Sequence, residues 1–232
     1  MICFAQLNIP VPIIEIQRET MQLLESKSWL PHYNQYHYTG AWDVLPLRTP
    51  GGDSNNTFAD LMNQENYQDT PILEQLPVTK RLLHNLQCEK LSARLLNLKA
   101  GAVIKQHRDY ELAFEKGEAR LHFAIFTNNN VEFYVEDKLL RMDEGQCWYI
   151  NANLMHNVAN YGITDRIHLV VDCVVNNWLE NIFDQSEKYS RDEEKDIGRQ
   201  LLIIENLRLQ QTDSANALAD KLEQELADGN TD

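Results

Sequence analysis

The spacing of hydrophobic residues changes twice along the 232-residue chain and divides it into three parts. In the first part, the apolar residues of segment 12–30 are placed to form one face of a helix. Segment 42–48 alternates between apolar and polar residues, as a half-buried strand does, and leads into a turn-rich cluster at 49–56. Helical spacing returns over 79–89. The first part is therefore predicted to consist of helices and loops that support the rest of the chain.

The second part is a series of short strands. Runs of β-branched, aromatic and other apolar residues are separated by polar turns, such as the one at 128–130. The expected strands cover residues 93–99, 103–104, 120–126, 131–135, 139–140, 146–150 and 166–172. Many short strands with polar turns between them are typical of an antiparallel sandwich or a small barrel. The sequence therefore predicts a mainly β core with flanking helices.

The third part begins near residue 177, where the strand pattern stops. Its apolar residues lie near helical spacing: Leu201, Leu202, Ile204, Leu207, Leu218, Leu222 and Leu226. Acidic residues are dense in the same part. We therefore predict two units, a β domain with N-terminal helical support at 1–176 and an acidic helical appendage at 177–232. The appendage either covers the sheet or lies in solvent, or it forms the interface of a homodimer.

The charge of the chain limits what it binds. Its 35 acidic and 21 basic residues give a formal net charge of −14, which repels the phosphate backbone of nucleic acids. No run approaches the roughly 18 apolar residues of a membrane span, and the start of the chain lacks the basic segment of a signal peptide. The four cysteines have neither a CxxC pair nor zinc-finger spacing, which suits a reducing compartment. We expect a cytoplasmic protein with neither nucleic acid nor membrane as a partner.

One set of residues has the composition of a metal site. His107 and Asp109 are two positions apart, so that both can turn toward one point where a strand enters a loop. His156, which comes after the expected strand 146–150, can supply a third ligand from a distant part of the chain. Two imidazoles and one carboxylate form the facial triad of non-haem Fe(II) oxygenases, which leaves positions open for a co-substrate and oxygen. The alternative is that these are hydrogen-bonded core or surface residues.

Arg166 makes the metal hypothesis more specific. It lies ten residues after His156, in an otherwise apolar strand, where a cation is costly unless it meets an anion. The co-substrate 2-oxoglutarate needs both a metal that it can chelate and a cation for its distal carboxylate. The alternative for this arginine is an ion pair with Asp165 or Asp172. Four further histidines are interpreted as structural: His32, His37, His84 and His168.

Three blocks of the chain carry a resemblance to a known family. They read RLLNLKAGAVIKQHRD at 94–109, RLHFAI at 120–125, and MHNV and DRIHLVVD within 155–172. Over 93–173 the chain resembles the aspartyl/asparaginyl β-hydroxylase family of Fe(II)/2-oxoglutarate oxygenases, which includes bacterial relatives that hydroxylate free proline. The resemblance implies a double-stranded β-helix, the jelly-roll or cupin-like fold.

The same resemblance implies roles for individual residues. His107 and His156 are the implied iron ligands, and Arg166 is the implied anchor of the co-substrate. In the family, the arginine and the histidine of the R-x-H strand approach the carboxylates of 2-oxoglutarate. In this chain they are Arg120 and His122, and their alternative is a core histidine beside an outward arginine.

Asp109 indicates which branch of the family the chain is similar to. The animal enzymes that modify aspartyl residues lack a carboxylate at this position, whereas the proline-hydroxylating relatives keep the complete HxD pattern. A free amino acid such as proline is therefore favoured over an Asp or Asn residue in a peptide. Arg94 and Arg48 are candidates for binding the substrate carboxylate, and Trp42 is a candidate for an apolar wall, although surface ion pairs explain many arginines.

The sequence thus predicts a dioxygenase that uses Fe(II), 2-oxoglutarate and O2 to hydroxylate an unactivated C–H bond, with release of succinate and CO2. Three alternatives stay open. The first is a β-hydroxylase of Asp or Asn residues in a peptide or protein. The second is a cupin-like metal protein without oxidative chemistry, which has no need of Arg166. The third is an inactive scaffold that binds partners through the C-terminal helices, for which damaged ligands are expected.

Overall fold

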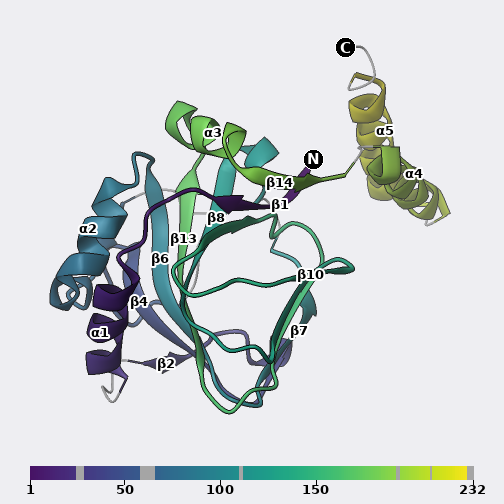
Figure 1. Ribbon diagram of the computed structural model, residues 1–232. Coiled ribbons are helices and arrows are strands. Elements are labelled where there is room, and N and C mark those ends of the chain that lie inside the picture. Colours follow the sequence, from purple (N-terminus) through teal and green to yellow (C-terminus); the bar gives the residue numbers. More distant parts are fainter. Residues whose placement is uncertain (25–28, 58–65, 110–111, 192–193, 210, 229–232) are drawn as a thin grey trace. The chain divides into compact units, whose positions relative to one another are not determined.

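The computed structural model describes residues 1–24, 29–57, 66–109, 112–191, 194–209 and 211–228 (Figure 1). Contacts between residues divide the chain into two compact units. Residues 2–189 form the first unit, and Met1 with residues 190–232 forms the second. No helix in the described part of the chain has the length and apolar character needed to cross a membrane.

The larger sheet of the first unit has nine strands in the described structure. In the spatial order given next, all neighbouring strands between β1 and the edge strand β2 are antiparallel. The spatial order is β14 (Glu187–Ser190), β1 (Ile2–Leu7), β11 (Cys147–Ile150), β8 (Glu118–Phe126), β13 (Arg166–Val174), β6 (Lys90–Leu98), β4 (Trp42–Pro50) and β2 (Leu30–Pro31). Strand β5 (Tyr67–Asp69) pairs with β4 outside this order. The strands β8, β13 and β6 form the centre of the sheet.

The smaller sheet has five antiparallel strands and lies opposite the larger one (Figure 1). Its order is β10 (Lys138–Leu140), β9 (Val131–Val135), β12 (His156–Asn160), β7 (Val103–His107) and β3 (Tyr38–Thr39). Two facing antiparallel sheets of this kind form a jelly roll, or double-stranded β-helix. The prediction of a mainly β fold with flanking helices is confirmed.

In the described ranges of the first unit, three α-helices and three short 3-10 helices accompany the sheets. They are α1 (Ile13–Leu23), α2 (Pro77–Asn85), α3 (Asn177–Asp184), η1 (Gln35–His37), η2 (Leu73–Gln75) and η3 (Phe114–Lys116). Apolar side chains of the three α-helices pack into one hydrophobic core with the outer face of the larger sheet. Helix α1 ends at Leu23, and Leu30 already belongs to a strand, so the helix expected over 12–30 is too long.

Alternation along the central strands separates the hydrophobic core from the inner face of the sheet. On β13, Ile167, Leu169 and Val171 lie in the core. Successive side chains of a strand point to opposite faces, so that Arg166 and His168 lie on the other side, toward the smaller sheet. Arg94 of β6 and Arg120 of β8 obey the same rule, since their chain neighbours lie in the core and both side chains line the space between the sheets. The fold therefore collects buried charges between the two sheets.

The second unit is a pair of helices, α4 (Glu194–Leu209) and α5 (Asp213–Asp228). Ile204, Ala215 and Ala219 are buried in it, and Arg208 forms ion pairs with two acidic residues of α5. The predicted division at residue 176 differs from the division by contacts. Residues 177–189 belong to the first unit, because α3 buries Leu179 and Phe183 in the hydrophobic core.

Candidate active site

A cavity of about 300 Å³ lies between the two sheets. Both sheets contribute to its lining, since Arg94, Arg120 and Arg166 come from the larger sheet and His107 and His156 from the smaller one. Its volume is at the lower end of the range of small-molecule sites. The cavity therefore has room for small ligands, and its walls carry several charged groups.

His107, Asp109 and His156 come together at this cavity. His107 ends β7 and His156 begins β12, and the two residues are directly opposite each other in the ladder between these strands. One ligand atom from each of the three residues lies within 4.8 Å of the others. Pairing of β7 with β12 is thus what brings the distant histidine to the HxD pattern.

The hydrogen bonds of both histidines leave a nitrogen lone pair for a metal. Nδ1 of His107 is 2.8 Å from the carbonyl oxygen of Lys105, and Nδ1 of His156 is 2.9 Å from that of Leu154. A carbonyl oxygen only accepts hydrogen bonds, so each Nδ1 carries the proton and each Nε2 has a lone pair. Burial lowers the pKa of His107 and lowers that of His156 to about 4, so both rings are neutral at pH 7.

Asp109 supplies the negative charge of the group. Burial raises the pKa of its carboxyl group, but Arg120 and the two histidines together lower it below the usual value. Nη1 of Arg120 donates to Oδ2 of Asp109, while Oδ1 lies 4.0 Å from Nε2 of His107. Two neutral imidazoles and one ionised carboxylate are the donor set that suits Fe(II). The residues present therefore fit the metal that the sequence predicts.

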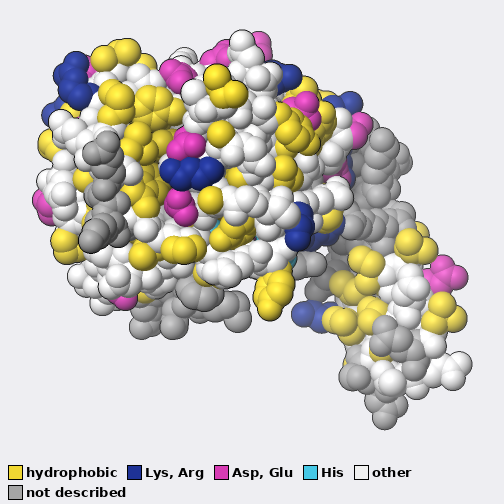
Figure 2. Space-filling model, turned by 90° about the horizontal axis from the view of Figure 1, so that it is seen from below, with side chains coloured by type: hydrophobic (Ala, Val, Ile, Leu, Met, Phe, Trp, Pro, Cys, Tyr) yellow, Lys and Arg dark blue, Asp and Glu magenta, His cyan; other side chains and the backbone are white. Residues whose placement is uncertain are grey.

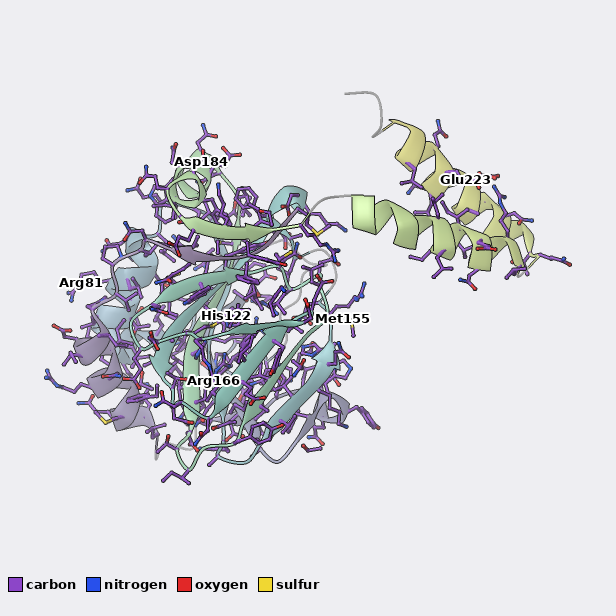
Figure 3. All side chains as sticks on the ribbon, turned by 45° about the vertical axis from the view of Figure 1, so that its right-hand side comes forward. Arg81, His122, Met155, Arg166, Asp184 and Glu223 are labelled. Atoms are coloured by element: carbon purple, nitrogen blue, oxygen red, sulfur yellow. The ribbon has the colours of Figure 1, made fainter. Side chains whose placement is uncertain are left out.

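Arg166 is buried in the same cavity without an ion pair in the described part of the chain. Its side chain is among the largest that are fully buried, and Figure 3 shows it with His122 in the interior of the β unit. Nη2 donates to Nδ1 of His168 at 3.0 Å, and Nε has no hydrogen-bond partner among the described residues. Burial lowers the pKa of Arg166 to about 9, which leaves the group protonated at pH 7.

The two carboxylates that could have paired with Arg166 are engaged elsewhere. Asp165 accepts a hydrogen bond from Lys99 at 2.8 Å. Asp172 is fully buried and pairs with Arg94 and Arg120. The alternative of a structural ion pair for Arg166 is therefore not seen among the described residues, where this buried cation has no counter-ion.

The R-x-H strand contributes two residues with different surroundings. His122 is buried, and both of its ring nitrogens lack a hydrogen-bond partner among the residues described. Burial and then Arg166 lower its pKa far below the usual value, so the ring is neutral. Arg120 lines the cavity but is held by two carboxylates, since it donates to Asp172 at 2.7 and 3.0 Å as well as to Asp109.

Two of the three predicted substrate residues line the cavity. Arg94 is buried and donates to Asp172 at 2.9 Å, and its Nε lacks a partner within the described ranges. The ring of Trp42 stacks on that of His32, with the ring centroids 3.6 Å apart. Both residues therefore remain available to contact a ligand.

Arg48, the third predicted substrate residue, does not line the cavity. It pairs with Asp69 at 2.8 Å and donates to the carbonyl oxygen of Lys90. The pairing of β4 with β6 shifts by one residue between Pro46 and Arg48. This β-bulge breaks the alternation that would place Arg48 on the face of Trp42.

The sequence did not point to the segment between β2 and β3, although it contributes four residues to the cavity. These are His32, Tyr33, Asn34 and His37. Burial and Arg94 lower the pKa of His32 to about 3, so its ring is a neutral part of the wall. The only signal in the sequence is the density of histidine and tyrosine over 32–38. Such irregular segments have no periodicity from which side-chain direction can be predicted.

The structure is a jelly roll that directs two histidines and a carboxylate into its interior, an architecture and donor set that suit a metal site. The chain belongs to the aspartyl/asparaginyl β-hydroxylase family, whose model matches residues 13–175. The resemblance found in the sequence is confirmed.

Curated relatives are similar over about two thirds of the chain. It is 28% identical over 156 residues to an L-proline cis-4-hydroxylase of Rhizobium meliloti, an alignment that covers 66% of this chain and 55% of the relative. It is 26% identical over 155 residues to an L-proline cis-3-hydroxylase of a Streptomyces species, with 65% and 52% covered. The chain thus spans about half the length of the curated relatives that it matches. Among solved structures, a prolyl-4-hydroxylase of Pseudomonas putida aligns with a TM-score of 0.47 and 10% identity, over 76% of this chain and 95% of that one.

Proposed function

We propose that the protein is an Fe(II)- and 2-oxoglutarate-dependent dioxygenase that hydroxylates a small free amino acid, with proline or a similar amino acid favoured. The observation that carries this proposal is Arg166, a buried cation with no counter-ion in the described part of the chain, in the same cavity as His107, Asp109 and His156. A metal site alone would suit many reactions, but a metal site with a separate carboxylate anchor suits 2-oxoglutarate. Membership in the family and the two proline hydroxylases among its relatives support the proposal.

In this proposal, His107 and His156 hold the iron through Nε2 and Asp109 holds it through a carboxylate oxygen. The bound iron with its co-substrate supplies the oxidation, in which O2, 2-oxoglutarate and a substrate C–H bond become succinate, CO2 and a hydroxylated product. Arg166 binds the distal carboxylate of 2-oxoglutarate. His122 is the neighbouring group with unpartnered nitrogens, and it donates to a carboxylate oxygen of the same molecule.

Arg94 and Arg120 create a second place for an anion. They share the single carboxylate of Asp172, so one positive charge remains when Asp109 is bound to metal. We assign the carboxylate of the substrate to this charge, with Arg94 as the donor because its Nε lacks a partner in the described structure. Arg120 orients Asp109 and keeps Asp172 in place.

The stack of Trp42 on His32 forms a flat, uncharged part of the wall against which an aliphatic ring can pack. A cavity of about 300 Å³ fits 2-oxoglutarate and one small molecule better than a folded peptide segment. These two features support a free amino acid over an Asp or Asn residue within a protein.

The test begins without oxygen. Protein loaded with Fe(II) and 2-oxoglutarate is expected to show the weak visible charge-transfer band of the chelate. The band should disappear in His156→Ala and need far more 2-oxoglutarate in Arg166→Ala. Matched controls are His84→Ala, an exposed histidine, and Arg48→Ala, an arginine outside the cavity. Absence of the band in folded, metal-loaded wild-type protein would contradict the proposal and favour a cupin-like protein without oxidative chemistry.

The substrate is then identified by measuring turnover in the presence of oxygen. Succinate release is compared for L-proline, other free amino acids and short peptides that contain Asp or Asn. Turnover coupled to a free amino acid, with a raised KM in Arg94→Ala, is the expected result. Coupling to the peptides alone would replace the proposed substrate class by the β-hydroxylation of peptide residues.

We also propose a homodimer that forms through α4 and α5. Leu201 and Leu202 are 54% and 58% exposed in the helical unit, and Figure 2 shows hydrophobic side chains at the surface of this unit. Light scattering should give a dimer for wild type and a monomer for Leu202→Glu. Gln224→Glu, which adds the same charge at an exposed polar position, should remain dimeric. A monomeric wild type would contradict the proposal.

The proposed location is the cytoplasm, because the four cysteines are buried thiols that form no disulfide, which suits a reducing compartment. Nucleic acid is not a proposed partner, given the net charge of −14.

A further inference from the structure

Arg166, which forms no ion pair with any residue that the structure describes, has a histidine as its hydrogen-bond partner. Arg166 and His168 are two residues apart on β13 and lie on its inner face. Nη2 of Arg166 lies 3.0 Å from Nδ1 of His168, and both side chains are at most 2% exposed. The guanidinium group also lies 5.5 Å from the ring of Phe133. The arginine is thus held from two sides by uncharged rings.

The direction of this hydrogen bond fixes the state of His168. A guanidinium group has no acceptor, so Arg166 must donate and Nδ1 must accept. The proton of the imidazole is then on Nε2, and the ring is neutral. Its burial beside a cation agrees with this state. His168 therefore orients the guanidinium group and leaves its positive charge in place.

The inner face of β13 also carries a charged acceptor for arginine side chains. This acceptor is Asp172, six residues after Arg166, which pairs with Arg94 and Arg120 and offsets part of their charge. A carboxylate at position 168 would likewise hold Arg166, but it would satisfy the arginine before any ligand arrives. A neutral acceptor avoids this, since electrostatic attraction for an anion depends on the net charge of the pair.

The charged residues on the other side of Arg166 and His168 do not change the net charge of this pair. Arg166 and His168 also line a smaller cavity of about 40 Å³, to which Arg141 and Asp143 contribute one charge of each sign. Asp143 is engaged with Gln146 and forms no ion pair with Arg166. On the neighbouring strand β8, the ring of His122 lies beside that of His168, with the centroids 5.8 Å apart.

We infer that His168 is a positioning residue that determines co-substrate specificity: as a neutral hydrogen-bond acceptor it fixes Arg166 in place with its full charge, so that the site selects a 2-oxo acid that has a second carboxylate. This inference rests on the proposed function. It assigns a role to a histidine that is not among the lining residues of the cavity of the candidate metal ligands and that the sequence indicates only as structural.

The experiment compares His168→Asn with His168→Asp. The two side chains have the same shape, and each offers an oxygen to Arg166, but only the aspartate brings a negative charge. His168→Leu removes the acceptor, and His84→Asp places the same substitution at an exposed histidine as a control. Full-length, Fe(II)-loaded proteins are titrated without oxygen by calorimetry. The two probes are 2-oxoglutarate and 2-oxopentanoate, which has the same chain length and no distal carboxylate.

The ratio of the two affinities is the quantity of interest, because a merely structural role would weaken both probes alike. We expect the ratio of wild type to be kept in His168→Asn and to fall about tenfold or more in His168→Asp, with His168→Leu between them. Equal ratios in the Asn and Asp variants would overturn the inference while the proposed function stands. A wild type that binds neither probe would overturn the proposed function and, with it, the inference.

Discussion

Asp172 is the residue on which the arrangement of charges in the cavity depends. Its carboxylate is fully buried and accepts hydrogen bonds from Ser92, Arg94 and Arg120. Through Arg120 it is connected to Asp109, and thus to the candidate metal site. Breaking a buried ion pair leaves a charge without compensation, which costs far more than losing a pair at the surface.

Replacing Asp172 by Asn is therefore expected to destabilise the protein strongly. The loss in free energy of unfolding should be about 3–5 kcal/mol, because two buried guanidinium groups lose their carboxylate. Urea denaturation followed by circular dichroism measures it. Asp69→Asn, which breaks the partly exposed pair with Arg48, serves as the control and should cost less than about 1 kcal/mol. Similar losses in both variants would contradict the assignment.

The same carboxylate predicts a dependence on pH. Burial raises the pKa of Asp172, but Arg120 and Arg94 outweigh burial and lower it to about 2. A group whose pKa is lower in the folded state stabilises the fold at a pH above its unfolded value, and this contribution is lost as the pH falls through the folded value. The free energy of unfolding should thus fall by about 2 kcal/mol between pH 5 and pH 2 on account of Asp172. In Asp172→Asn this part of the decline should be missing when unfolding is measured over the same range.

At the scale of elements, the strands that could be predicted are those with an apolar pattern of their own. The strands at β6, β8, β9, β11 and β13 are evident from their apolar or alternating residues. Strand β12, His156–Asn160, has a polar and small sequence, and only its ladders with β7 and β9 define it. The spacing of HxD, His156 and Arg166 indicated the site, but their convergence depends on those ladders.

Features that break a regular pattern could not be predicted from the sequence. The bulge between Pro46 and Arg48 moves a predicted substrate residue away from the cavity. The cavity wall at 32–37 comes from a segment with no regular repeat. The pairing of Arg120 with Asp109 and Asp172 depends on the juxtaposition of strands that are far apart in the chain. In each case the decisive contact is a tertiary one.

Helix α3 gives a test of the boundary between the two units. Phe183 is buried, with its ring stacked on Phe114 at 4.2 Å and edge-on to Tyr149 at 5.0 Å. Phe183→Ala should lower the free energy of unfolding of the β unit by about 3–5 kcal/mol, as measured by thermal or urea unfolding. Leu209→Ala, at an exposed position of α4, should change it by less than about 0.5 kcal/mol. Comparable effects would place α3 with the appendage, as the sequence pattern predicts.

At the scale of the whole molecule, the candidate metal ligands and the hydrophobic core are held by different groups. The three candidate ligands are fixed by protein groups: His107 and His156 by backbone carbonyl oxygens, and Asp109 by Arg120. The hydrophobic core lies on the other face of the larger sheet. The metal site and the core are therefore separate parts of the β unit.

Removal of metal should consequently leave the fold intact. Protein treated with a chelator is expected to keep its circular dichroism spectrum and to unfold cooperatively. Added Fe(II) under anaerobic conditions should raise Tm, because a ligand that binds only the folded state stabilises it. Loss of the cooperative transition on chelation would show that the metal is part of the fold.

The contact between Arg120 and Asp109 has a consequence for how such a protein is supplied with metal. Because Arg120 pairs with Asp109, the carboxylate of the candidate metal site already has a counter-ion in the metal-free chain, which can therefore be synthesised and kept while iron is scarce. Under the proposed function, a cell that regains iron could restore the activity from this reserve within the time of metal uptake, without making new protein.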